Sequence, residues 1–361
     1  MKKLVLVGLV LLASVIVLVG CDTNAGDTPS STGGTTQQPG SEGTGGDSAK
    51  KAEDLTLTIS DASGSPTSVT LQDTDSDGYY EIGTADELYA FAAAVNGGKT
   101  TINGELTSSI EVNKTVLDEQ GNLSKNVNFR PWTPIGNGDT PYTGIFYGAD
   151  KTISGLSFND TNADYAGLFG YLAEGGSVQN LGVLDSYFCG GRYVGGVVGS
   201  NDGQVTTCYN TGAVSGTSED SSFNVGGVVG SNTRQVTNCY NTGSVTGEGS
   251  VCGGGVVGYN DGGDVTNCYN TGSVTGVDYS YYVGGVVGYN FSGEVSNCYY
   301  LSGTAEQGVS NDNDNGTAEA MDEFFFASEG MAELLNDNQE DGPWKYINEN
   351  SAPTLKAFNK G

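Results

Sequence analysis

Short apolar runs separated by Gly, Asn and Asp recur along the second half of the chain. The segment VGGVVG begins at Val194, Val225 and Val283, and a fourth copy, GGGVVG, occupies residues 253–258. Residues 166–170, AGLFG, form a looser first copy. Measured from the glycine before each apolar pair, at positions 167, 196, 227, 255 and 285, the steps are 29, 31, 28 and 30 residues. Such a period is typical of repeat architectures.

Each repeat contains three short extended runs, typified by GVVG, VTNCY and GSVTG. These runs are too short for a free hairpin and too rich in β-branched residues for a helix. A turn of about 30 residues that closes as one three-sided rung predicts an all-β parallel β-helix. Glycines are expected to supply positive φ angles at the rung corners.

Equivalent positions in successive rungs should stack along the solenoid axis at a spacing of ~4.8 Å. Asparagines that share a position should then form hydrogen-bonded ladders, as stacked amides do in cross-β assemblies. One predicted ladder contains Asn238, Asn267 and Asn297, and another contains Asn201, Asn232, Asn260 and Asn290.

A cysteine and a tyrosine also recur side by side. The cysteines are Cys208, Cys239, Cys268 and Cys298, and the tyrosines are Tyr209, Tyr240, Tyr269 and Tyr299. The first copy has Leu181 at the cysteine position, so this position should face the core as buried free thiols. By strand alternation the tyrosines then point outward. They are a candidate binding face for sugar rings or a partner protein, or they stack only to stabilise the sheet.

Both ends of an open stack of strands need covering. Thr84 and Glu87 form a capping box that predicts a helix, with Leu88 and Phe91 on its apolar face and Gly97 as its stop. At the other end, two short amphipathic helices and an apolar tail should close the column. Their apolar residues are Met321, Phe324, Phe325, Met331, Leu334, Leu335, Trp344, Ile347, Leu355 and Phe358.

The N-terminus predicts export. Lys2 and Lys3 precede an uncharged apolar run from Leu4 to Gly20, as in a secretory signal. The residues LVGC that end at Cys21 resemble the bacterial lipobox, which implies that Cys21 is lipidated and becomes the mature N-terminus. The alternative is an uncleaved anchor helix, because 17 residues is about the shortest span of a bilayer. Both interpretations predict a membrane-anchored protein located outside the cytoplasm or at the cell surface.

Composition excludes several functions. The chain has 43 acidic and 14 basic residues, a formal net charge of −29 and no His. The charge opposes binding to nucleic acid, which needs clustered Lys and Arg. The absence of His excludes Ser-His-Asp and Cys-His catalysis and zinc sites that use His.

An acidic loop is the candidate metal site. Asp73, Asp75 and Asp77 alternate before Gly78, and Glu81 follows at position 9 of a calcium-loop pattern. Position 12 is Thr84 instead of the usual bidentate Glu. We therefore expect either no cofactor, with the loop as a solvated turn, or calcium bound by these four carboxylates.

The repeats resemble the GLUG motif of bacterial surface proteins, named for Gly-Leu-any-Gly. Residues 167–170, GLFG, match the name, whereas the other copies have Val in place of Leu. Residues 79–96, 131–136 and 153–157 resemble the segments that precede the repeats in this family, so the resemblance spans about 79–310. It implies a right-handed β-solenoid displayed at the surface, and it supplies no catalytic residues.

The expected organisation has five parts. They are a lipoprotein signal peptide (1–20), a disordered Gly/Ser/Thr linker (21–54), an N-terminal strand and capping helix (55–98), the β-helix (99–310) and a C-terminal helical cap (311–361). The GLUG-like repeats are expected at about 165–192, 193–223, 224–250, 251–281 and 282–309.

Two functions fit this organisation. The first is a lipid-anchored cell-surface solenoid that acts as a non-catalytic, adhesin-like binding or structural module. Its partners are the membrane, through Cys21, and a glycan or surface protein. The second is a polysaccharide lyase or glycoside hydrolase acting on extracellular glycans, which needs converging carboxylates or a basic catalytic residue. Only Arg130, Arg192 and Arg234 are available as arginines.

Overall fold

The computed structural model describes most of the chain after the N-terminal region. The described residues are 50–125, 127–217, 223–248, 251–277, 282–310, 316–348 and 351–358. The predicted signal peptide, Cys21 and residues 21–49 of the linker lie outside them. None of the described helices is both long and apolar enough to cross a bilayer.

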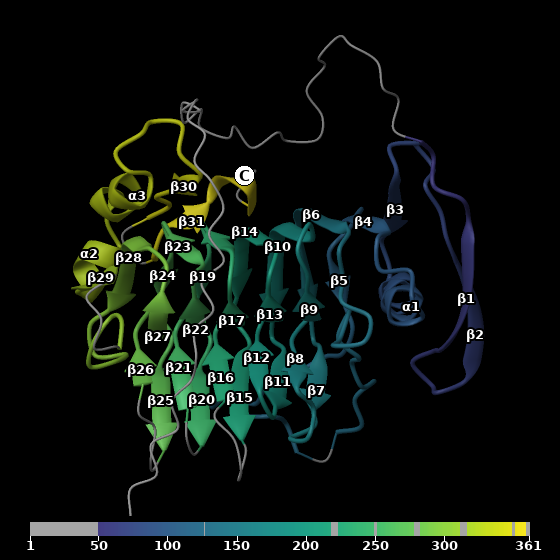
Figure 1. Cartoon of the computed structure of the whole chain (residues 1–361), viewed down its shortest axis with the longest axis horizontal. Helices are drawn as coiled ribbons and strands as arrows, with labels where there is room; N and C mark the ends of the chain where they lie inside the picture. Colours follow the sequence, from purple (N-terminus) through teal and green to yellow (C-terminus); the bar gives the residue numbers. More distant parts are fainter. Residues whose placement is uncertain are drawn as a thin grey trace, which may run out of the picture. The chain divides into compact units, whose positions relative to one another are not determined.

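The repeats form a parallel β-solenoid in which each turn contributes strands to four sheets (Figure 1). We call these sheets walls 1 to 4, in the order in which the chain passes through them. Wall 1 contains β8 (Tyr165–Ala166), β12 (Tyr193–Gly195), β16 (Phe223–Gly226), β21 (Val251–Gly254) and β26 (Tyr282–Gly284). Wall 2 contains β9 (Phe169–Leu172), β13 (Val198–Asn201), β17 (Val229–Asn232), β22 (Val257–Asp261) and β27 (Val287–Ser292).

Wall 3 is the largest sheet, with twelve strands. Its solenoid strands are β6 (Ile145–Ser154), β10 (Ser177–Leu184), β14 (Gln204–Asn210), β18 (Gln235–Thr237), β19 (Tyr240–Asn241), β23 (Asp264–Thr266), β24 (Tyr269–Asn270) and β28 (Val295–Leu301). Wall 4 contains β7 (Ser157–Asn159), β11 (Tyr187–Gly190), β15 (Ala213–Thr217), β20 (Val245–Glu248) and β25 (Val274–Val277).

The predicted three-sided rung is therefore wrong, because the VGGVVG segment is not one strand. The chain bends at Gly196 between β12 and β13, and walls 1 and 2 meet there. A Cβ atom on Gly196 would lie 2.4 Å from Cγ of Asn210, whose side chain fills this corner. Gly227 and Gly255 face Asn241 and Asn270 in the same way, at 2.3 Å in both cases. These glycines are required for space.

The prediction that corner glycines supply positive φ angles is confirmed between walls 2 and 3, where φ is 88° at Gly175, 83° at Gly262 and 100° at Gly293. Positive φ also recurs in wall 3, at the residue before each cysteine of the ladder. Its φ values are 57° at Thr207, 55° at Asn238, 54° at Asn267 and 50° at Asn297. Asn is the non-glycine residue that enters the left-handed region at lowest cost.

Both predicted asparagine ladders are confirmed. Nδ2 of Asn201 donates to Oδ1 of Asn232 at 2.7 Å, Asn232 to Asn260 at 2.7 Å, and Asn260 to Asn290 at 2.8 Å. Asn297 and Asn267 donate along the other ladder, at 2.8 and 3.2 Å.

A third ladder was not predicted. Asn210, Asn241 and Asn270 are fully buried and are linked by bonds of 3.0 and 2.9 Å. Each Nδ2 also donates to the carbonyl of the glycine two residues later. The three amides therefore satisfy the turn backbone and one another inside the column.

The interior is otherwise apolar. Val178, Val205, Val236 and Val265 stack on wall 3 and are fully buried. The cysteine ladder also faces this core, as predicted, and Leu181 pairs in register with Cys208. Burial raises the pKa of the Cys208 and Cys268 thiols well above the ordinary value. Cys208, Cys239, Cys252, Cys268 and Cys298 are free thiols.

Before the first repeat, the predicted helix is confirmed as α1 (Ala85–Asn96). Oγ1 of Thr84 accepts from the N–H of Glu87 at 3.2 Å, and Phe91 packs edge-on against Phe146 of β6 at 5.5 Å. The neighbouring strands are β1 (Leu55–Ser60), β2 (Pro66–Leu71), β3 (Tyr79–Ile82), β4 (Asn103–Leu106) and β5 (Ile110–Glu111). β1 and β2 form an antiparallel hairpin, whereas β3, β4 and β5 extend wall 3.

After the last repeat, β29 pairs in parallel with β28 and the chain then returns over wall 3. The elements are β29 (Gly316–Met321), α2 (Glu323–Phe326), α3 (Glu329–Leu335), β30 (Trp344–Lys345), β31 (Thr354–Leu355) and the 3₁₀ helix η1 (Lys356–Phe358). We call residues 316–358 the C-terminal segment.

The ladders predict a large energetic cost for losing one amide. Replacing Asn232 by Ala deprives Asn201 and Asn260 of a buried partner, which should lower the free energy of unfolding by about 3 kcal/mol. Urea unfolding measures this change. Thr237→Ala is the control, because its hydroxyl pairs with Thr266 at 3.0 Å at a partly buried site, and should cost less than about 1 kcal/mol. Equal losses in the two variants would contradict a special role for the ladder.

Candidate functional site

The predicted tyrosine face exists as a stack on the outside of wall 3. Tyr209 and Tyr240 have ring centroids 4.7 Å apart and planes inclined by 2°, and Tyr240 and Tyr269 follow at 4.9 Å and 7°. Tyr299 pairs in register with Tyr269. The outward orientation is therefore confirmed, because Cys208 and its equivalents occupy the interior.

The same rings are not an exposed binding face, so that prediction is wrong. Tyr209, Tyr240, Tyr269 and Tyr299 are exposed by only 8, 8, 1 and 7%. The C-terminal segment covers them. Trp344 lies 5.3 Å from the ring of Tyr269, Phe358 meets Tyr209 edge-on at 4.9 Å, and Oη of Tyr269 donates to the carbonyl of Pro353 at 2.7 Å. Burial raises the pKa of Tyr209 to about 12.

This covering explains where the C-terminal apolar residues go. Met331, Leu335, Trp344 and Leu355 were expected to close the end of the column, but they share an apolar cluster with the tyrosine stack on its side. The stack is an apolar strip that an unrepeated segment can bury, which is favourable at roughly 25 cal/mol per Å². Phe324 and Ile347 were assigned to the same seal but are 89 and 44% exposed.

The predicted calcium loop brings its carboxylates together. Ligand oxygens of Asp73, Asp75 and Glu81 lie within 4.8 Å of one another, and those of Asp75, Asp77 and Glu105 form a second such group. Glu105 was not predicted. It arrives from β4, which pairs in parallel with β3 so that Glu81 and Glu105 are register partners.

The loop backbone holds Asp73 in place. Its carboxylate accepts hydrogen bonds from the N–H groups of Ala52 at 2.7 Å, Ser76 at 2.7 Å and Gly78 at 3.0 Å. Burial opposes ionisation of Asp73, but these bonds outweigh it and lower its pKa. In contrast, burial and the neighbouring acidic charges raise the pKa of Glu105.

One oxygen of the loop is unsatisfied. Oε1 of Glu81 accepts from the backbone N–H of Thr74 at 2.7 Å, whereas Oε2 is buried and has no hydrogen-bond partner among the described residues. A buried carboxylate oxygen without a donor is costly unless a cation neutralises it. The two overlapping groups of three carboxylates supply the oxygen ligands that a hard cation such as calcium prefers.

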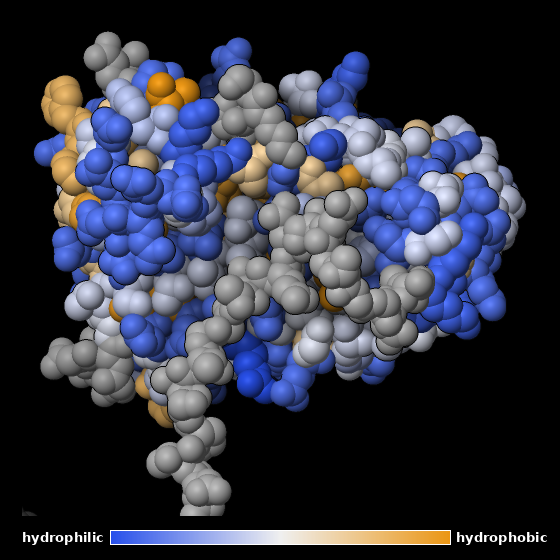
Figure 2. Space-filling model, turned by 90° about the horizontal axis from the view of Figure 1, so that it is seen from above, coloured by the Kyte–Doolittle hydropathy of each residue, from blue (hydrophilic) through white to orange (hydrophobic). Residues whose placement is uncertain are grey.

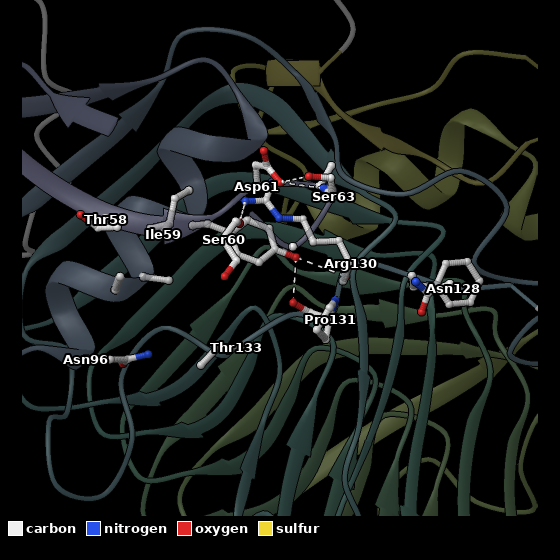
Figure 3. A pocket seen from close by; sticks show the side chains of 16 residues that line it. Thr58, Ile59, Ser60, Asp61, Ser63, Asn96, Asn128, Arg130, Pro131 and Thr133 are labelled. Carbon is white, nitrogen blue, oxygen red and sulfur yellow. Dashed lines mark hydrogen bonds between the residues drawn. The ribbon is translucent and has the colours of Figure 1, made fainter. Parts of the chain in front are cut away.

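A cavity of about 650 Å³ lies between the β1–β2 hairpin, α1 and residues 128–133 (Figure 3). Its principal charged side chain, Arg130, is already bound within the protein. Nη1 donates to Asp86 at 2.8 Å, Nη2 donates to the carbonyl of Ser60 at 2.5 Å, and the guanidinium lies 3.8 Å from the centroid of the Tyr89 ring. Arg130 therefore fastens the hairpin to α1, and its side chain is only 8% exposed.

The other two arginines are also paired. Arg192 forms an ion pair with Asp164 at 3.5 Å, and Arg234 forms one with Glu174 at 2.5 Å. Each side chain is more than half exposed, so these pairs contribute little stability. They do place a carboxylate against each guanidinium. In the face of the molecule shown in Figure 2, hydrophilic residues predominate and hydrophobic ones form small separate patches.

Comparison with known proteins supports the repeat assignment. The GLUG motif matches residues 221–246, 249–275 and 279–299, so the chain contains GLUG repeats in the later turns of the solenoid. The chain is 30% identical over 141 residues to "Halomucin" of Haloquadratum walsbyi, a match that covers 38% of this chain and 2% of that protein. It is 34% identical over 77 residues to a "Putative Gly-rich membrane protein" of Evansella cellulosilytica, covering 20% of this chain and 9% of the relative.

A solved structure shares the fold. It is a "putative immunoglobulin A1 protease" from Bacteroides ovatus, with a TM-score of 0.57 over 77% of this chain and 92% of that chain. The identity is 20%, so the likeness extends to the architecture alone. The two proteins therefore share a solenoid fold.

The covered tyrosine stack makes a stability prediction. Tyr269→Ser removes a ring that contacts Tyr240 and Trp344, together with the hydroxyl bond to Pro353, and should cost about 3–5 kcal/mol. Thermal melting and limited proteolysis of the C-terminal segment measure the effect. Tyr259→Ser is the control, because this half-exposed ring stacks on Tyr289 outside the cluster and should cost less than about 1.5 kcal/mol. If Tyr269→Ser changes neither measurement, the segment does not cover the stack.

Proposed function

We propose that the chain is a lipid-anchored cell-surface solenoid that acts as a non-catalytic, adhesin-like binding or structural module. The GLUG repeats and the relatives named as a halomucin and a Gly-rich membrane protein support a surface-associated solenoid. The lipobox-like residues that end at Cys21 support the lipid anchor.

The non-catalytic assignment rests on the ion pairs formed by the arginines. Arg130, Arg192 and Arg234 are all of the arginines in the chain, and each is paired with a carboxylate. A lyase that abstracts a proton from an acidic sugar needs a basic residue free to reach it. The lack of His removes another common base and the His ligands of zinc peptidases.

The anchor is tested by Cys21→Ser. Since the thiol is the group that accepts the lipid, the variant should lose lipid-dependent membrane partition while the wild-type chain remains in the membrane fraction. Fractionation and mass measurement of the mature N-terminus detect the change. Cys252→Ser is the matched control, because Cys252 lies in wall 1 of the solenoid, and should partition as the wild type does.

Two results would contradict this function. Unchanged partition and mass in Cys21→Ser would remove the lipid anchor. Reducing or unsaturated ends that form in an extracellular glycan incubated with the pure protein would establish the alternative, a polysaccharide lyase or glycoside hydrolase.

We also propose that the acidic loop binds calcium, through Asp73, Asp75, Asp77 and Glu81 with Glu105. The buried, unpartnered Oε2 of Glu81 favours this role over a solvated turn. A cation here would tie β3 and β4 together ahead of the first solenoid turns. Its role would be structural, because it would stabilise only the folded form.

Calcium should therefore raise the melting temperature of the protein relative to chelator. At a concentration 100 times the Kd, the gain is about 2.7 kcal/mol. Asp75→Asn should abolish the gain, since Asp75 belongs to both carboxylate groups. Asp139→Asn, an exposed acid on a loop outside both groups, should retain it. Identical melting curves of the wild type in calcium and in chelator would remove the site.

A further inference from the structure

A second set of tyrosines forms a stack that is half-exposed. Tyr165 of β8 lies between Tyr171 of β9 and Tyr193 of β12, with ring centroids 5.4 and 5.3 Å away. The planes of Tyr165 and Tyr171 are inclined by only 5°. We call these three residues the outer tyrosine stack.

Strand pairing accounts for only part of this stack. Tyr165 and Tyr193 are register partners in wall 1, but Tyr171 belongs to wall 2 and reaches across the corner to lie on Tyr165. Neither apolar cluster of the described residues includes the three rings, in contrast to the covered stack on wall 3. The outer tyrosine stack thus presents aromatic surface at an edge of the solenoid.

A polar groove begins where the stack ends. Oη of Tyr171 donates to Oδ2 of Asp202 at 2.5 Å, and Asp202 lines a groove of about 620 Å³. The groove runs over the turns between walls 2 and 3 of four consecutive repeats, from Glu174 past Asp202 and Arg234 to Asp264. Three repeat spacings make it ~14 Å long, parallel to the solenoid axis.

The groove offers fixed hydrogen-bonding groups. Oγ1 of Thr233 donates to Oδ1 of Asp202 at 2.7 Å, so both oxygens of this carboxylate are oriented by neighbours. Arg234 is oriented by its ion pair with Glu174. The amides of Gln204 and Gln235 are exposed at the same edge. Held in this way, acceptors and donors lose little entropy when they bind a ligand.

We propose that the outer tyrosine stack and this groove bind a neutral oligosaccharide that lies along the solenoid axis. The faces of Tyr171 and Tyr193 that do not contact Tyr165 can stack on the apolar faces of sugars, and carboxylates and amides pair with sugar hydroxyls. Glu174, Asp202 and Asp264 outnumber Arg234, so an acidic polymer is repelled. This inference rests on the proposed function, because it names the ligand of the binding module.

The test uses the purified full chain in detergent and titration calorimetry. The probes are cellohexaose, mannohexaose and xylohexaose, with hexagalacturonate as the acidic counterpart. At least one neutral hexasaccharide should bind, and hexagalacturonate should bind at least tenfold more weakly. Tyr171→Ala and Asp202→Asn should each weaken binding about tenfold, the loss expected for one stacking or oriented hydrogen-bonding partner.

Two matched variants serve as controls. Tyr289→Ala removes a half-exposed ring of wall 2 that stacks on Tyr259 and lies in the repeat after the last one that lines the groove. Asp261→Asn changes an exposed acid at the end of β22 that does not line the groove. Both should bind as the wild type does. Melting curves verify that every variant is folded.

The outcomes separate this inference from the proposed function. It is overturned if no neutral probe binds the wild type, if only hexagalacturonate binds, or if folded Tyr171→Ala and Asp202→Asn bind unchanged. In each case the lipid anchor and the absence of cleavage remain as measured. Cleavage of a bound probe would overturn the proposed function while leaving the groove as the binding site.

Discussion

The solenoid depends on contacts between identical positions of successive repeats. A repeat of about 30 residues has four or five strands of only two to eight residues, and no single strand can satisfy its own backbone hydrogen-bonding groups. Stacking at ~4.8 Å satisfies those groups through parallel pairing with the next turn. The buried amides of Asn201, Asn232 and Asn260 make the same connection through side chains, so they fix the register that the short strands would otherwise leave weakly specified.

The same periodicity creates a problem that the C-terminal segment solves. Once Cys239 faces inward, strand alternation forces Tyr240 outward, and repetition turns single tyrosines into a continuous apolar strip. An exposed strip of this kind favours association with other molecules. Trp344 and the short helices bury it, and they leave the outer tyrosine stack on walls 1 and 2 as the half-exposed aromatic surface of the early repeats. One group of aromatic residues therefore stabilises the fold, and another lies at the surface.

How much could be predicted from the sequence follows from what is repeated. A residue type that recurs at the same point of each repeat indicates a column, so the Asn201 ladder and the buried Cys208 column could be predicted. The helix after Thr84 could be predicted from its local capping box. Unrepeated segments carry no such signal, and nothing in the tyrosine pattern indicates that Trp344 will lie on it. Four walls also differ from three by one bend, and this bend requires glycine at Gly196 because Asn210 occupies the space that a side chain would need. That constraint joins two parts of a repeat and has no periodic signature.

The same distinction between repeated and unrepeated residues applies to the candidate sites. Glu105 joined the acidic loop because β3 and β4 pair in parallel, and the alternation in residues 79–82 and 103–106 was the available signal. Within the repeats the interior positions are committed to ladders and packing, so chemistry that varies from turn to turn can reside only at the corners and outer faces. The groove around Asp202 has this character: its charged residues differ from turn to turn, although Gln204 and Gln235 repeat beside them. A regular column that aligns unlike polar groups at one edge is a rigid support for recognising an extended chain, and such alignment requires no catalytic residue.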